Sequence, residues 1–351
     1  MSVTVTTHER PGVYSVYESS GLVRSSGVKN VALIAMAGEG DGVTVHTWYS
    51  YAQAVADLGE KEEMAQLARL LFANGAGAVY GVPVKTKGMY AAAVGTVEAM
   101  ENIGLVVCDS TDLAVQQAVR DSVVAAAEAR MERIAVLPGG AGESVQELCD
   151  RAAAMNCERV VLVCPDSMGD DGEAAGCARC AAAVAGAVAR ESDPAVPLGG
   201  AMLYGLGGIS ARYSDNEIDA LVRGGVTALE SVNGMVSVVR GITTRTKTGG
   251  VNDTSWRELT TILVVDEVIP GIRAALRKKF HRAKNTAQSR NAIRSQVILE
   301  LERRVDREII TGYEDVAVSA LKDDPTVCLV EFAFTVAYGL NQIWISAHIT
   351  I

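Results

Sequence analysis

The sequence has little of what membrane proteins and secreted proteins need. No apolar run reaches the roughly 20 residues of a membrane-spanning helix, and VALIAMA at 31–37 is among the longest. The N-terminus has no basic segment followed by an apolar one, so it does not resemble a secretory signal. We therefore expect no membrane insertion and a cytoplasmic protein.

Residues that carry catalysis are scarce. Only four histidines occur, and among them His46 stands alone, without a Gly-x-Ser-x-Gly elbow elsewhere to support a Ser-His-Asp triad. Cys177 and Cys180 form a single CxxC, whereas a zinc site needs a second pair of ligands. The seven cysteines mostly lie in apolar stretches, which indicates free, buried thiols. We expect no catalytic residue, no metal and no cofactor.

Two glycine-rich loops keep a different function open. GEGDG (38–42) and LPGGAGES (137–144) both follow expected strands, and a phosphate could bind the helix start after the second. Neither loop completes GxGxxG or the Lys-Ser/Thr of a P-loop, so tight turns are the preferred interpretation. A nucleotide- or phosphate-binding α/β enzyme remains the alternative function.

An alternation of apolar strands and amphipathic helices dominates the first two thirds of the chain. Strands at 103–109, 133–138 and 159–165 alternate with helices at 89–102, 112–131, 143–156 and 173–191. This pattern predicts βαβ units and a doubly wound α/β domain over 21–250. Asn233-Gly234 between two β-rich runs predicts a hairpin.

The last quarter has a different character. After the polar loop TKTGGVNDT (246–254), we expect helices at 255–281 and 286–310, with Pro270-Gly271 dividing the first into two pieces. Strands follow near 313–319 and 326–338. These elements predict a small α+β domain over 251–338.

Charge is distributed unevenly. The formal net charge is −10, which argues against direct nucleic-acid binding, yet residues 271–310 hold eleven Lys and Arg against four Asp and Glu. A basic stretch on an acidic chain indicates an acidic partner. A solvated helix face is the simpler alternative for these residues.

Both ends of the chain have the alternating pattern of half-buried strands. Val3 and Val5 alternate with polar residues at one end, and Ile343, Ile345, Ile349 and Ile351 do so at the other. Open strand edges pair with other chains unless they are blocked. We expect exchange with neighbouring subunits, and pairing within the chain's own sheet as the alternative.

Several motifs recur in a fixed order along the chain: RPGVY at 10–14, then Asn216, Ile218, Leu221, Gly225 and Val226, the run Gly234 to Thr244, and Trp256 with Asp266. Together they resemble the tail sheath proteins of contractile phage tails and related injection particles. Their order holds across nearly the full length.

The resemblance implies a structural role. Subunits would polymerise as stacked hexameric rings around an inner tail tube protein and contract to drive it through a target envelope. Baseplate and tail terminator proteins would be further partners. The family's α/β domain has a subtilisin-like topology, which concerns the fold and not protease activity. An oligomeric compartment shell is a third possible function.

The resemblance also assigns roles to residues. Segments 1–20 and 339–351 would be linker arms that join the C-terminal sheets of neighbours, with hinges at Gly21, Gly27 and Gly339. The basic helices would face the tube through these residues: Arg277, Lys278, Lys279, Arg282, Lys284, Arg290, Arg294, Arg303 and Arg304.

Overall fold

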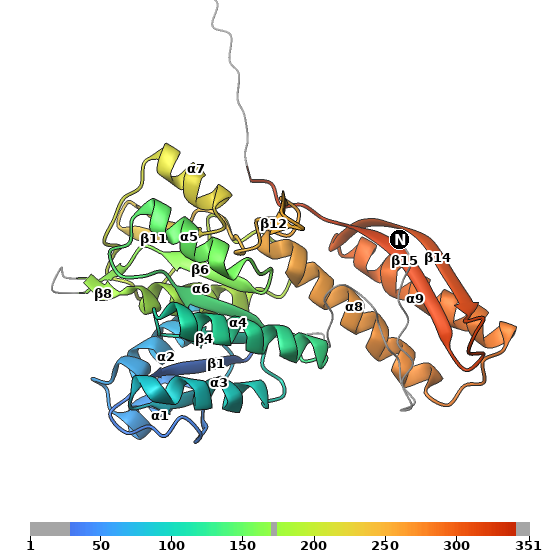
Figure 1. The fold of residues 1–351 in the computed structure, drawn as a ribbon, viewed down its shortest axis with the longest axis horizontal. Coiled ribbons are helices and arrows are strands. Elements are labelled where there is room, and N and C mark those ends of the chain that lie inside the picture. Colours follow the sequence, from blue (N-terminus) through green and yellow to red (C-terminus); the bar gives the residue numbers. More distant parts are fainter. Residues whose placement is uncertain (1–28, 170–173, 342–351) are drawn as a thin grey trace, which may run out of the picture.

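The computed structural model describes residues 29–169 and 174–341. A nine-stranded mixed sheet forms the larger part, here called the sheet body, in the order β2-β3-β1-β4-β5-β6-β10-β11-β9 (Figure 1). Its central strands run parallel, whereas β2 at one edge and β11 and β9 at the other run antiparallel to their neighbours. The strands are β1 Val31–Met36, β2 His46–Trp48, β3 Val79–Val84, β4 Leu105–Cys108, β5 Ile134–Pro138, β6 Val160–Cys164, β9 Met202–Leu203, β10 Thr227–Val232 and β11 Met235–Val238.

Helices cover both faces of this sheet, as the sequence alternation predicts. Val31, Leu33 and Ala35 of β1 point into one core with α1, α2 and α6, while Ala32 and Ile34 point into a second core with α3, α4, α5 and α7. Successive side chains of a strand point to opposite faces of the sheet, and helices cover both faces, so both sets are fully buried. The helices are α1 Tyr51–Leu58, α2 Glu63–Asn74, α3 Tyr90–Glu98, α4 Leu113–Glu128, α5 Val145–Met155, α6 Cys177–Arg190 and α7 Asp215–Arg223.

Short elements complete the sheet body. Asn233 and Gly234 both have positive φ and connect β10 to β11, so the predicted hairpin is confirmed. The predicted helix at 173–191 begins only at Cys177, after a small β-ribbon. The remaining short elements are the 3₁₀ helix η1 Lys87–Met89 and the strands β7 Ser167–Met168, β8 Ala174–Gly176, β12 Lys247–Thr248 and β13 Val251–Asn252.

A helix–hairpin unit follows the sheet body. It consists of α8 Leu259–Phe280, α9 Ala287–Asp306, β14 Ile310–Ala320 and β15 Cys328–Val336. Figure 1 shows α8 leading away from the sheet body toward the hairpin. Ile262 of α8 belongs to the core of the sheet body, whereas Val264, Val268 and Ile272 belong to a third core shared with α9 and the hairpin.

The predicted division of α8 at Pro270-Gly271 is wrong, because a single helix spans both residues. Proline leaves the carbonyl four residues earlier without its helical donor and displaces the backbone nearby. For Pro270 that carbonyl belongs to Asp266, and next to it Arg304 of α9 donates from Nη2 to the Glu267 carbonyl oxygen at 3.2 Å. Gly271 provides the space, because a Cβ at that position would lie 1.8 Å from Arg304 Nη2.

A buried ion pair joins α8 to the sheet body. Arg159, at the amino end of β6, donates from Nη1 and Nη2 to the two carboxylate oxygens of Asp266 at 2.8 and 2.9 Å. Both side chains are almost completely buried, so this bidentate pair fixes the direction of α8. The sequence motif that includes Asp266 gave no indication of its partner, 107 residues away.

Candidate functional site

The usual ligand position of such a sheet is filled by the protein itself. Ligands of doubly wound folds bind at the carboxyl ends of the strands where the strand order reverses, here between β1 and β4. At this point Asp109 accepts the Met36 backbone N–H at 2.8 Å and the Tyr90 hydroxyl at 2.5 Å. Burial raises the pKa of Asp109, which fits a structural carboxyl enclosed by the protein.

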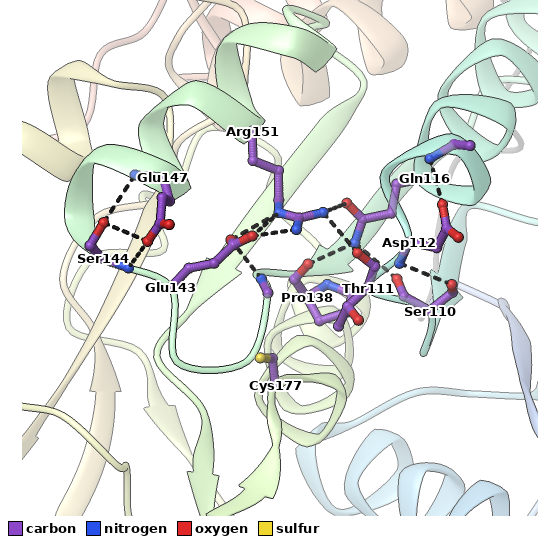
Figure 2. A network of polar contacts seen from close by, with 12 residues as sticks. Ser110, Thr111, Asp112, Gln116, Pro138, Glu143, Ser144, Glu147, Arg151 and Cys177 are labelled. Atoms are coloured by element: carbon purple, nitrogen blue, oxygen red, sulfur yellow. Dashed lines mark hydrogen bonds and ion pairs between the residues drawn. The ribbon is translucent and has the colours of Figure 1, made fainter.

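The loop LPGGAGES also contains its own anion (Figure 2). The Glu143 carboxylate accepts the Gly140 backbone N–H at 2.9 Å and Arg151 Nε at 2.9 Å. Arg151 in turn donates to the Thr111 carbonyl and to Gln116, whose amide donates to the Pro138 carbonyl. The hydrogen bonds from Arg151 hold the pKa of Glu143 below its usual range. A phosphate at this loop would have to displace Glu143.

The first glycine-rich loop is similarly enclosed. Asp41 accepts the backbone N–H groups of Val43 and Thr44, and Glu62 accepts that of Gly38. A Cβ on Gly40 would lie 2.6 Å from the Pro83 backbone, so this glycine is needed for a close turn. Both loops therefore support the turn interpretation and not the nucleotide-binding alternative.

Thiols and acidic side chains form no metal site in the described ranges. All seven cysteines are free, and five of them are buried, as the sequence analysis expects. Burial raises the pKa of Cys180 and of Cys177, which also contacts Asp166, so neither is an activated thiolate. The acidic run at 170–173 lies outside the described residues. Across the described ranges, helices long and apolar enough to cross a membrane are absent.

The basic stretch gathers at the end of α8 and in the following loop. Arg277, Lys278, Arg282 and Lys284 are exposed, and in the part of the chain described here they form no ion pair with a carboxylate. Lys279 is exposed as well, and its Nζ donates to Gln296 at 3.0 Å. Cations at a helix C-terminus are favoured by the helix dipole. These five residues form the basic end of α8.

The basic residues of α9 form hydrogen bonds and ion pairs within the helix–hairpin unit. Arg290 donates to Asn285, and Arg294 donates to the Val316 carbonyl at 2.8 Å. Arg303 is exposed but pairs with Glu300. Arg304 is buried and also pairs with Glu300, so it is removed from the candidates for a surface contact. The sequence pattern did not distinguish these arginines from those of α8.

The β14–β15 hairpin has two open edges among the described residues. The two strands pair with each other from Ile310–Val336 to Ala320–Cys328. Val330, Phe332 and Phe334 pack toward α9, while the residues between them are exposed. Two strands alone bury too little apolar surface to be stable. Helix α9 supplies the missing cover on one face, and within the described part of the chain neither edge pairs with a third strand.

The predicted arms lie largely outside the described residues. Val3, Val5, Gly21, Gly27, Ile343, Ile345, Ile349 and Ile351 are all in undescribed segments. Gly339 is described, and a Cβ there would lie 2.6 Å from the Pro197 Cβ. The chain therefore leaves β15 in close contact with the sheet body at Gly339.

Similarity to known proteins covers most of the chain. A family model described as the phage tail sheath protein central domain matches residues 80–244, and one described as the phage tail sheath C-terminal domain matches residues 251–350. The tail sheath protein of Bacillus phage SP01 is 30% identical over 224 residues. That match covers 60% of this chain and 37% of the phage protein, so the chain spans little more than a third of that relative.

Solved structures share the fold. The helical sheath of the anti-feeding prophage in its contracted state has a TM-score of 0.71 at 16% identity, covering 97% of this chain and 99% of the other. The sheath tail protein of Desulfitobacterium hafniense has a TM-score of 0.71 at 14% identity, covering 93% and 100%. With sheet body, helix–hairpin unit and both family models in agreement, the chain belongs to the phage tail sheath protein family.

Proposed function

We propose that this protein is a contractile tail sheath subunit. It polymerises as stacked hexameric rings around an inner tail tube and contracts to drive the tube through a target envelope. The particle assembles in the host cytoplasm, with baseplate and tail terminator proteins at its ends. The α/β domain over 21–250, with its subtilisin-like topology, acts as a scaffold beside the α+β domain over 251–338.

The β14–β15 hairpin carries this proposal. Its two edges are open among the described residues, and β-strand addition needs an edge of this kind. The arms at 1–20 and 339–351 of neighbouring subunits occupy these edges. Contacts in which one subunit's arm enters another's body are heterologous, and they generate rings or helices.

The basic end of α8 supplies the second contact. Its exposed cations meet an acidic surface of the tube, because exposed side chains without an internal carboxylate partner remain available. During contraction, subunits reorient as rigid bodies about the arm hinges at Gly21, Gly27 and Gly339.

Deletion of 341–351 tests the arm mechanism. We expect the full chain to form long tubes in negative-stain images and the deleted chain to remain small. The control is Thr248→Ala in the exposed β12 strand of the sheet body, which should leave the tubes unchanged. Normal tubes from the deleted chain would contradict the arm mechanism, and closed shells from the full chain would favour a compartment.

A further inference from the structure

Glu132 lies where α8 crosses the amino ends of the parallel strands. It lies two residues before β5, whereas Arg159 directly precedes β6 and is paired with Asp266 of α8. The side chain of Glu132 is only 3% exposed. This carboxyl is thus part of the joint between the sheet body and the helix–hairpin unit.

Glu132 differs from the other buried acids of the joint because neither of its carboxylate oxygens has a hydrogen-bond partner. Asp266 is bound by Arg159, and Glu158 accepts from Arg245 at 2.7 Å. An ionised carboxylate that is buried without hydrogen bonds is strongly disfavoured, so such a group keeps its proton.

The charges around Glu132 shift its pKa in opposite directions. Asp266 of α8 repels its ionised form, while Arg273 of α8 and Arg159 attract it. Arg133 is directed elsewhere, since it donates to the carbonyls of Val97 and Met100. Lys29 faces Asp266, Glu267 and Glu191. Burial, reinforced by Asp266, raises the pKa of Glu132 to about 8.

We propose that Glu132 is a pH-responsive element of this joint, whose protonated carboxyl lets α8 pack against the strand ends and whose ionisation loosens that packing. The folded state binds the proton more tightly than the unfolded state. The contribution of protonated Glu132 to the free energy of unfolding is therefore complete below the ordinary pKa of 4.5. It is lost as the pH rises to about 8. The proposal concerns the joint within one subunit and does not depend on sheath assembly.

The test is urea unfolding of the full chain from pH 5 to 9, comparing the wild type with Glu132→Gln. The amide has the shape of the protonated acid but does not ionise. We expect the ratio of the two unfolding equilibrium constants to change by up to about tenfold per pH unit, and to level off above pH 8. Glu128→Gln, an exposed residue at the end of α4, is the matched control and should follow the wild type.

A second measurement uses the wild type alone and therefore tests the proposal even if Glu132→Gln does not fold. Amide hydrogen exchange of α8 in the wild type, corrected for the intrinsic pH dependence, should accelerate between pH 6 and 9 more than that of β5. Parallel pH profiles for wild type and Glu132→Gln would overturn the proposal. Unchanged corrected exchange in α8 would overturn it equally.

Discussion

At Glu143, one carboxylate closes the loop between β5 and α5 by binding both Gly140 and Arg151. The same charge in a nucleotide-binding protein would come from the ligand. Here it comes from the chain, which converts a potential anion site into a folded turn (Figure 2).

We predict that Glu143→Gln lowers the free energy of unfolding by about 1–3 kcal/mol at pH 7, because Arg151 loses its charged partner. The folded-state pKa of Glu143 lies below its ordinary value of 4.5. Its contribution is thus present above pH 4.5 and is lost as pH falls through the lowered pKa.

Urea unfolding at pH 7 and at pH 3 checks this prediction. The difference between the variant and the wild type should shrink at the lower pH. Glu147→Gln, at an exposed capping box, serves as the control for a carboxylate without an arginine partner, and it should have a smaller effect. An equal loss from both variants at pH 7 would show that Arg151 adds nothing.

At the scale of elements, α8 depends on a partner that lies far along the chain. Arg304 of α9 packs against Gly271 and donates to the α8 backbone at Glu267, close to Pro270. Gly271 is therefore a packing requirement within a helix, although glycine is usually a poor helix residue.

We predict that Gly271→Ala lowers the free energy of unfolding by about 1–3 kcal/mol, because the added methyl group displaces the Arg304 guanidinium. Gly95→Ala is the matched control, since Gly95 lies within α3, is exposed and has nothing near its Cβ position. There the same change should stabilise the protein by about 0.5–1 kcal/mol. Thermal unfolding of both variants measures the contrast, and a stabilised Gly271→Ala would refute it.

Local signals made much of the fold predictable. The Asn233-Gly234 hairpin depends on neighbouring residues alone, and it is confirmed. The contact between Gly271 and Arg304 could not be predicted, since Arg304 comes from α9. Glu143 and Arg151 were likewise invisible as a pair, because the sequence does not show that a loop will fold over its own carboxylate.

The candidate site was predictable only in outline. Charge counting located the basic stretch but could not separate exposed Arg277 from buried Arg304, since both lie in basic, helical sequence. Exposure depends on which face α9 presents to α8 and the hairpin, and that is decided by packing between elements.

At the scale of the whole molecule, the C-terminal end of α8, which carries the basic residues, is the end farther from the sheet body (Figure 1). Surface charges of this kind contribute little to folding, but they direct association with a partner of opposite charge. Loss of these charges should therefore affect assembly more than stability, to which the helix dipole contributes about 0.3–1 kcal/mol per cation in the last turn.

We predict that replacing Arg277, Lys278, Arg282 and Lys284 with Glu abolishes co-sedimentation with the tube protein of the same particle. Thermal unfolding should show a folded variant with a lower midpoint, because acidic groups at a helix C-terminus are unfavourable. Lys85→Glu with Lys87→Glu, at exposed positions of the sheet body, is the control and should retain binding. Wild-type binding should also weaken at high salt. Retained binding after the fourfold reversal would rule out this surface as the tube contact.

Helix α8 contributes Ile262 to one core and Val264 to another, only two residues apart. The helix is thus packed into the sheet body and into the helix–hairpin unit at the same time. The Arg159–Asp266 ion pair holds it in one orientation relative to the sheet. A force on the hairpin would therefore reach the nine-stranded sheet through α8 and the Arg159–Asp266 pair. We expect changes of shape in an assembly of this protein to arise at the boundaries between copies.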